Sequence, residues 1–124
     1  MGAMIEMDGF RIYQPGDTCL YEGLLGKLRR ESPIDVMILP INGRDGFRYR
    51  HGIIGNLTFQ EAADLAGIIK PQFVIPAHYD MIWGNTADPM DFIDYITAKY
   101  PDQKYWVGKP GDCLQLTSHC RCSE

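Results

Sequence analysis

Two short segments of the sequence end in side chains that can bind a metal ion. Tyr13–Thr18 contains Asp17, and Val74–Asp80 contains His78. Each segment begins as an apolar run, so the metal-capable side chain comes where a strand would stop. A carboxylate oxygen and an imidazole nitrogen together suit Zn²⁺, Mn²⁺ or iron. The pattern predicts part of a metal-dependent active site, with Asp17 and His78 as metal ligands and catalytic residues.

Both residues also have purely structural interpretations. Asp17 follows Pro15 and Gly16, where an aspartate can close a turn or cap a helix. A histidine that follows a buried strand, as His78 does, is often a hydrogen-bonded structural residue. The two positions support a site more strongly together than either does alone.

A second set of polar residues follows another predicted strand. Asn42 and Arg44 come just after the apolar run Val36–Leu39, and open α/β sheets bind ligands at such strand ends. Arg44, together with Arg48 and Arg50, could hold a phosphate or a carboxylate, although three arginines in a polar loop could equally be solvated. Asn42, Arg44 and Tyr79 are the candidate substrate-binding residues. Tyr79 and Trp83 are also explained as packing aromatic residues.

Apolar spacing and local turn signals predict the elements that position these residues. In the first half of the chain they indicate strands at 5–7 and 10–13 around Asp8-Gly9, a helix over 21–31 and a strand at 36–39. In the second half they indicate a helix from Thr58 to 69, a strand at 72–75, a helix opened by Asp88-Pro89, and a terminal hairpin of 104–107 with 113–116. Strands that alternate with helices indicate an α/β fold with helices packed against a sheet. The stretch from 42 to 57 is predicted to be a long polar loop.

The composition of the chain argues against some classes of partner. It has 124 residues and a formal net charge of −4, which argues against nucleic acid and anionic membranes as partners. No apolar run approaches the roughly 20 residues of a membrane span, and no signal-peptide pattern opens the chain, so we expect a cytoplasmic protein. We predict one α/β domain over residues 1–117 and a flexible tail over 118–124. The four cysteines are predicted to be free thiols.

The chain resembles a known family at four places. These are the strand that ends in Gly16-Asp17-Thr18, the segment Leu39–Arg44, the helix start Leu57–Ala62, and the segment Ile75–Asp80. They are similar to the metallo-β-lactamase fold hydrolases, and within that superfamily to the L-ascorbate-6-phosphate lactonase-like branch. The resemblance covers roughly residues 4–117.

The resemblance implies specific roles and one large gap. It assigns Asp17 as the carboxylate that bridges two metal ions and His78 as the last histidine ligand, on the second metal. The family's H-x-H-x-D-H motif is absent, and the only other histidines are His51 and His119. The chain therefore resembles the C-terminal half of the fold: half of an αββα sandwich, with a mixed sheet and helices on one face.

Two functional hypotheses follow from this resemblance. The first is a metal-dependent, lactonase-like hydrolase of small molecules, or the C-terminal half of one that is inactive alone, with Zn or Mn absent or weakly bound. The second is a non-catalytic half-fold domain that acts in assembly or interaction. In either case we expect the sheet to be covered by a second copy in a homodimer, or by a missing N-terminal half. The alternative is a monomer whose sheet is covered by its own long loop and terminal hairpin.

Overall fold

The structure is a computed structural model that describes residues 3–16, 21–44, 46–52, 55–77, 87–108 and 111–115. Its elements, in chain order, are β1 (Ala3–Met7), β2 (Phe10–Gln14), α1 (Leu24–Glu31), β3 (Val36–Pro40), α2 (Gly46–Arg50), α3 (Phe59–Ile69), β4 (Phe73–Ala77) and α4 (Pro89–Lys99). The predicted α/β class is confirmed.

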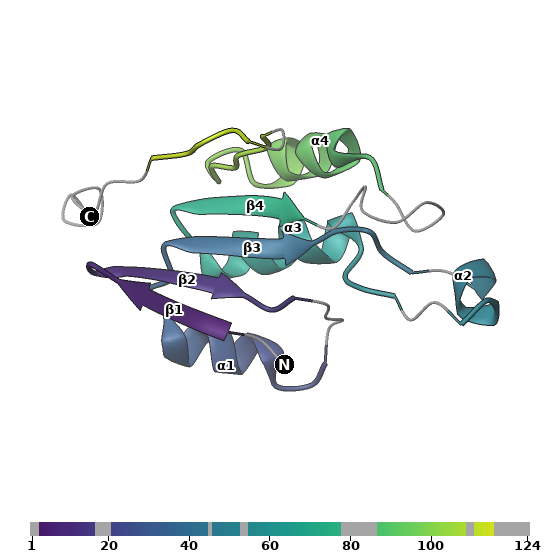
Figure 1. Ribbon diagram of the computed structural model, residues 1–124, viewed down its shortest axis with the longest axis horizontal. Helices are drawn as coiled ribbons and strands as arrows, with labels where there is room; N and C mark the ends of the chain where they lie inside the picture. Colours follow the sequence, from purple (N-terminus) through teal and green to yellow (C-terminus); the bar gives the residue numbers. More distant parts are fainter. Residues whose placement is uncertain are drawn as a thin grey trace.

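The four strands form one mixed sheet in the order β1-β2-β3-β4. The hairpin of β1 and β2 is antiparallel, and β2, β3 and β4 run parallel. Asp8 and Gly9 join the hairpin with φ values of 51° and 84°, the left-handed conformation that a tight two-residue hairpin turn requires. The parallel strands point to the same side of the molecule in Figure 1.

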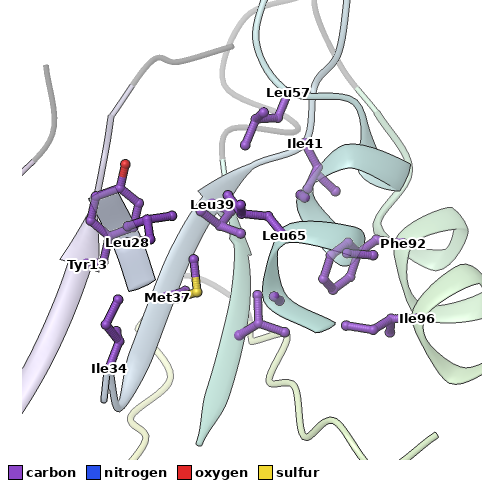
Figure 2. Close-up of a cluster of buried hydrophobic side chains, with 14 of the residues drawn as sticks. Tyr13, Leu28, Ile34, Met37, Leu39, Ile41, Leu57, Leu65, Phe92 and Ile96 are labelled. Carbon is purple, nitrogen blue, oxygen red and sulfur yellow. The ribbon is translucent and has the colours of Figure 1, made fainter. Parts of the chain in front are cut away.

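The helices α1, α3 and α4 share one hydrophobic core with one face of the sheet. Side chains alternate along a strand, so Tyr13, Met37 and Val74, which the register aligns, point to this face. Figure 2 shows Met37 and Leu39 directed toward the helices that carry Leu65, Phe92 and Ile96. Phe92 and Ile96 join α4 to this core, and both are fully buried.

Two predicted helix starts are confirmed by their hydrogen bonds. At α3, the Glu61 amide donates to the Thr58 hydroxyl at 3.2 Å, and the Thr58 amide donates to the Glu61 carboxylate at 3.0 Å. At α4, the Met90 amide donates to the Asp88 carboxylate at 2.9 Å. These contacts satisfy backbone donors that a helix leaves without an internal partner.

The second face of the sheet carries a continuous apolar row. The register aligns Ile5 with Ile12, Ile12 with Val36, and Val36 with Phe73. Val36 is 2% exposed, yet it lies outside the core cluster formed with the helices. Ile5 and Met7, at the edge of this face, are 41% and 65% exposed. Within the described residues, the helices therefore cover one face of the sheet only (Figure 1).

Two predictions about the elements were wrong. The stretch from 42 to 57 contains the short helix α2. The terminal hairpin does not form in the described part of the chain. Instead, Trp106 donates to the Val74 carbonyl at 3.1 Å and Val74 donates to the Lys104 carbonyl at 3.1 Å, in parallel with β4, while residues 111–115 form no strand.

No helix among the described residues is long and apolar enough to cross a membrane.

Candidate functional site

The three parallel strands end at one edge of the sheet. The register sets Tyr13, Met37 and Val74 at one level, so the strands approach this edge together. The chain leaves β2 toward Asp17, β3 toward Asn42 and β4 toward His78. This order places the end of β3 between the two strands that lead to the candidate metal ligands, as expected for a ligand site in an open α/β sheet.

Backbone hydrogen bonds hold the segment that follows β3. Ile41 donates to the Ala77 carbonyl at 3.0 Å, which continues the pairing with β4. Gly43 donates to the Leu57 carbonyl, and Asn56 donates to the Gly43 carbonyl, both at 3.0 Å. The segment after β3 is thus held between the end of β4 and the chain that enters α3.

Two glycines permit this close packing. Gly43 has φ 72°, a conformation that residues with a Cβ rarely adopt. A Cβ on Gly55 would lie 2.0 Å from the Cβ of Arg44, so any larger residue there would displace the segment. Both glycines let the chain that leads into α3 pack closely against the residues that follow β3.

A cavity of about 270 Å³ opens beside this segment. Asn42 and Arg44 line it, so the structure brings together two of the predicted substrate-binding residues. The other lining residues come from β3, α2, α3 and α4 and their flanks: Ile41, Gly43, Arg48, Thr58, Phe59, Gln60, Ala87 and Asp91. The lining combines charged, amide and apolar side chains.

Arg44 joins the cavity wall to the first turn of α3. Its guanidinium contacts both carboxylate oxygens of Glu61, at 2.6 and 2.8 Å, and donates to the Asn56 carbonyl at 3.0 Å. This two-pronged contact is the strongest geometry for an arginine–carboxylate pair. The hydrogen bond from Arg44 is the largest cause that holds the pKa of Glu61 below its ordinary value of 4.5, while burial opposes it. Arg44 therefore fixes the wall of the cavity.

Arg48 lies on the same cavity but makes a different contact. Its guanidinium donates to the Asn42 carbonyl at 2.5 Å, and Asn42 itself is only 1% exposed. Arg48 is thus held against the segment that follows β3.

Tyr13 lies near the carboxyl end of β2, and the pKa of its hydroxyl is raised. Burial, and to a lesser extent Tyr21, raises its pKa to about 12. Its side chain is part of the core and only 8% exposed. The hydroxyl therefore stays protonated across the physiological range, which fits a packing role.

Several predicted site residues lie outside the described residues. These are Asp17, His78, Tyr79 and Trp83, and their roles stay predictions. Arg50 and His51 are described, exposed, and located at the end of α2 and in the turn after it. Within the described ranges, no group of three or more histidine, cysteine or acidic residues is placed to hold a metal ion.

Sequence reasoning missed Asp91 as a residue of the cavity. Its position in the first turn of α4 was predictable, one residue before the buried Phe92. Its place beside Asn42 depends on α4 packing against α3, a long-range contact that no local pattern encodes.

The chain is similar in structure and in sequence to proteins described as hydrolases. The fold matches the structure of a metallo hydrolase from Ignicoccus hospitalis, with a TM-score of 0.70 and 26% identity, over 90% of this chain and 43% of that one. It also matches a Thermotoga maritima protein described as a Zn-dependent hydrolase of the metallo-β-lactamase superfamily, with a TM-score of 0.57 and 19% identity, over 86% of this chain and 62% of that one. The chain therefore shares its fold with these two hydrolase structures.

The chain also has relatives that are similar in sequence. The chain is 34% identical over 115 residues to a UPF0173 metal-dependent hydrolase of Pyrococcus furiosus, and 36% identical over 117 residues to one of Archaeoglobus fulgidus. Each match covers 93% of this chain but 45% of the relative, so the chain spans about half the length of these relatives. No protein-family model matches the chain.

Proposed function

We propose that this chain is part of a metal-dependent hydrolase that acts on a small molecule at the carboxyl edge of the sheet. The observation that carries the proposal is that β2, β3 and β4 reach this edge at one level. The sequence places Asp17, Asn42 and His78 directly after these three strands. The names of the sequence relatives, which call those proteins metal-dependent hydrolases, support it.

Asp17 and His78 are the proposed metal ligands. Their oxygen and nitrogen donors fit a divalent ion such as Zn²⁺ or Mn²⁺. Such an ion, when bound, acts as a Lewis acid on the substrate and acidifies a water molecule. The chain's own contribution at this edge is the cavity beside β3, where Asn42 and Arg44 are proposed substrate contacts. Tyr79, which lies outside the described residues, is the third proposed substrate contact. A lactone or a related ester is the proposed substrate class.

Two ligands are fewer than the three or four that well-held zinc sites use. We therefore expect the chain alone to hold at most one ion weakly and to lack appreciable lactonase or phosphodiesterase activity. The remaining ligands would come from polypeptide other than this segment. This agrees with the chain spanning about 45% of the relatives.

Metal titration tests the proposal. Calorimetric titration with Zn²⁺ and with Mn²⁺ is expected to show weak binding that is lost in both Asp17→Asn and His78→Gln. The matched control is His51→Gln, which removes an exposed histidine from the turn after α2 and should leave binding unchanged. Submicromolar binding that survives loss of Asp17 or His78, or turnover of a lactone that survives His78→Gln, would contradict the assignment.

A non-catalytic role in assembly is the second candidate. The observation that favours it is the apolar row Ile5–Ile12–Val36–Phe73 on the sheet face opposite the helices. Under this proposal a second copy of the chain covers that face. The two candidates are compatible, because the carboxyl edge and this face are different surfaces of the sheet.

A further inference from the structure

We propose that the hydroxyl of Tyr13 donates a hydrogen bond to an oxygen atom of the substrate at the carboxyl edge of the sheet. This inference deepens the proposed function and rests on it for the nature of the ligand, an ester or a lactone. It adds a binding residue that the sequence pattern did not single out, because Tyr13 lies inside a strand and not after one.

The side chain of Tyr13 is buried without a hydrogen-bond partner in the described part of the chain. The residue is only 8% exposed, and its hydroxyl exchanges no hydrogen bond with another described residue. Burial and, to a lesser extent, Tyr21 raise its pKa, and neither cause is a hydrogen bond. Buried tyrosine hydroxyls usually have a partner, because burying one without a hydrogen bond is costly. Packing therefore explains the ring of Tyr13 but leaves its hydroxyl without a role.

Two other tyrosines show how this chain satisfies such a hydroxyl. Tyr95 and Tyr100 are only partly buried, yet each donates to the Asp64 carboxylate, at 2.9 and 3.1 Å. The more deeply buried Tyr13 differs from them because no acceptor for it lies within the described residues. An unmet donor of this kind in a folded protein is explained when a ligand supplies the acceptor.

The position of Tyr13 directs this hydroxyl toward the candidate site. Tyr13 lies next to the last residue of β2, at the same level as Met37 of β3 and Val74 of β4. Figure 2 shows its hydroxyl oxygen on the side of the core toward which β3 continues to Ile41, which is the carboxyl edge. The sequence places Asp17 shortly after Tyr13 on the same chain segment. A ligand at this edge is therefore the acceptor that the hydroxyl faces.

The surroundings of the hydroxyl reach the molecular surface. Tyr21 is close enough to Tyr13 to raise its pKa, and Tyr21 is 51% exposed. Because the pKa of Tyr13 is raised to about 12, its hydroxyl remains a neutral donor at physiological pH. A neutral donor suits an uncharged oxygen acceptor and has no charge that would attract ions in general. The carbonyl oxygen of an ester or a lactone is an acceptor of this kind.

Binding of a small lactone tests the contact without catalysis. The probe is γ-butyrolactone, and its matched comparison is tetrahydrofuran, a ring of the same size that lacks the carbonyl oxygen. Each is titrated into the intact, EDTA-treated chain, labelled with ¹³C at the tyrosine ring carbon that bears the hydroxyl. We expect the lactone, and not the ether, to shift the Tyr13 signal saturably, because this carbon reports on hydrogen bonds of the hydroxyl. The signal is assigned by its absence from Tyr13→Phe.

Two tyrosine variants separate ligand binding from a structural role. Tyr13→Phe removes only the oxygen atom, so lactone binding, followed by amide shifts in β2, is expected to weaken about fivefold. Its midpoint of urea unfolding should stay the same or rise, because no hydrogen bond to a described residue is lost. Tyr100→Phe is the matched control: it removes a hydroxyl that donates to Asp64, so its midpoint should fall while lactone binding stays unchanged.

Each outcome decides the inference. It is overturned by the absence of a saturable lactone shift, by an equal response to lactone and ether, or by equal lactone affinity in the wild type and Tyr13→Phe. A urea midpoint that falls as far in Tyr13→Phe as in Tyr100→Phe also overturns it, because the hydroxyl of Tyr13 would then have a structural partner. A selective lactone contact in a chain whose Zn²⁺ and Mn²⁺ titrations fail would leave the Tyr13 assignment standing and remove the proposed hydrolase.

Discussion

At the scale of single residues, the contact between Arg44 and Glu61 has a predictable pH dependence. The pKa of Glu61 is lowered in the folded chain, chiefly by the hydrogen bond from Arg44. A group whose folded pKa is depressed stabilises the fold above its unfolded pKa, and this stabilisation is lost as the pH falls through the folded value. The contact should therefore contribute fully at neutral pH and fade below the ordinary value of 4.5.

A double-mutant cycle measures this contribution. Urea unfolding of the wild type, Arg44→Met, Glu61→Gln and the double variant should give a coupling of about 1 kcal/mol at neutral pH. The coupling should shrink toward zero as the pH falls through the depressed folded pKa of Glu61, where the carboxylate becomes protonated. A coupling that is constant with pH would show that packing, and not the charge of Glu61, holds the wall of the cavity.

At the scale of elements, the contact of α3 with α4 depends on a glycine. A Cβ on Gly67 would lie 2.4 Å from the ring of Tyr100, and that ring is held because its hydroxyl donates to Asp64 at 3.1 Å. Alanine would gain about 1 kcal/mol of helix propensity. The clash, however, must displace the ring, at a typical cost of about 1–3 kcal/mol.

We therefore expect Gly67→Ala to lower the free energy of unfolding. In a Tyr100→Ala background, where the ring is gone, the same change should raise it by up to about 1 kcal/mol. Urea unfolding of the four proteins gives both values. A change of the same sign in both backgrounds would show that the approach of Tyr100 does not dictate the glycine.

Local sequence signals predicted most of these elements, because their causes are local. Asp8-Gly9 sets the hairpin, Thr58 with Glu61 opens α3, and Asp88 with Pro89 opens α4. The short helix α2 was missed because five residues carry no helical period to detect. The predicted terminal hairpin was wrong because residues 104–106 pair with Val74, and this pairing depends on a residue far away in the sequence.

The residues of the candidate site also fall into those that the local sequence predicts and those that only the packing brings together. Asn42 and Arg44 were found because they follow a strand directly, and the structure brings both to one cavity. Asp91 joins them only through the packing of two helices. Asp17, His78 and Tyr79 lie outside the described residues, so their assignment depends on the sequence pattern and on their strands ending at a shared edge.

At the scale of the whole molecule, the second face of the sheet predicts self-association. The row Ile5–Ile12–Val36–Phe73 runs across all four strands, and the helices lie on the other side. Val36 in the middle of the row is only 2% exposed, so the largely open apolar surface lies at Ile5 and Met7, and an exposed apolar patch usually marks an interface. We propose that a second copy covers it in a purified sample. A twofold dimer, which places the same face on both partners, is the simplest arrangement.

Sedimentation equilibrium at micromolar concentration tests this, and two isoleucines of similar exposure give a matched comparison. Ile5 on the sheet face is 41% exposed, and Ile68 on α3 is 43% exposed. We expect the mass of the wild type to rise above 14.1 kDa with concentration. Ile5→Lys should suppress this rise, because a charge buried in the interface is costly, while Ile68→Lys should not. A species of 14.1 kDa at every concentration, or equal effects of the two lysines, would rule out a dimer through this face.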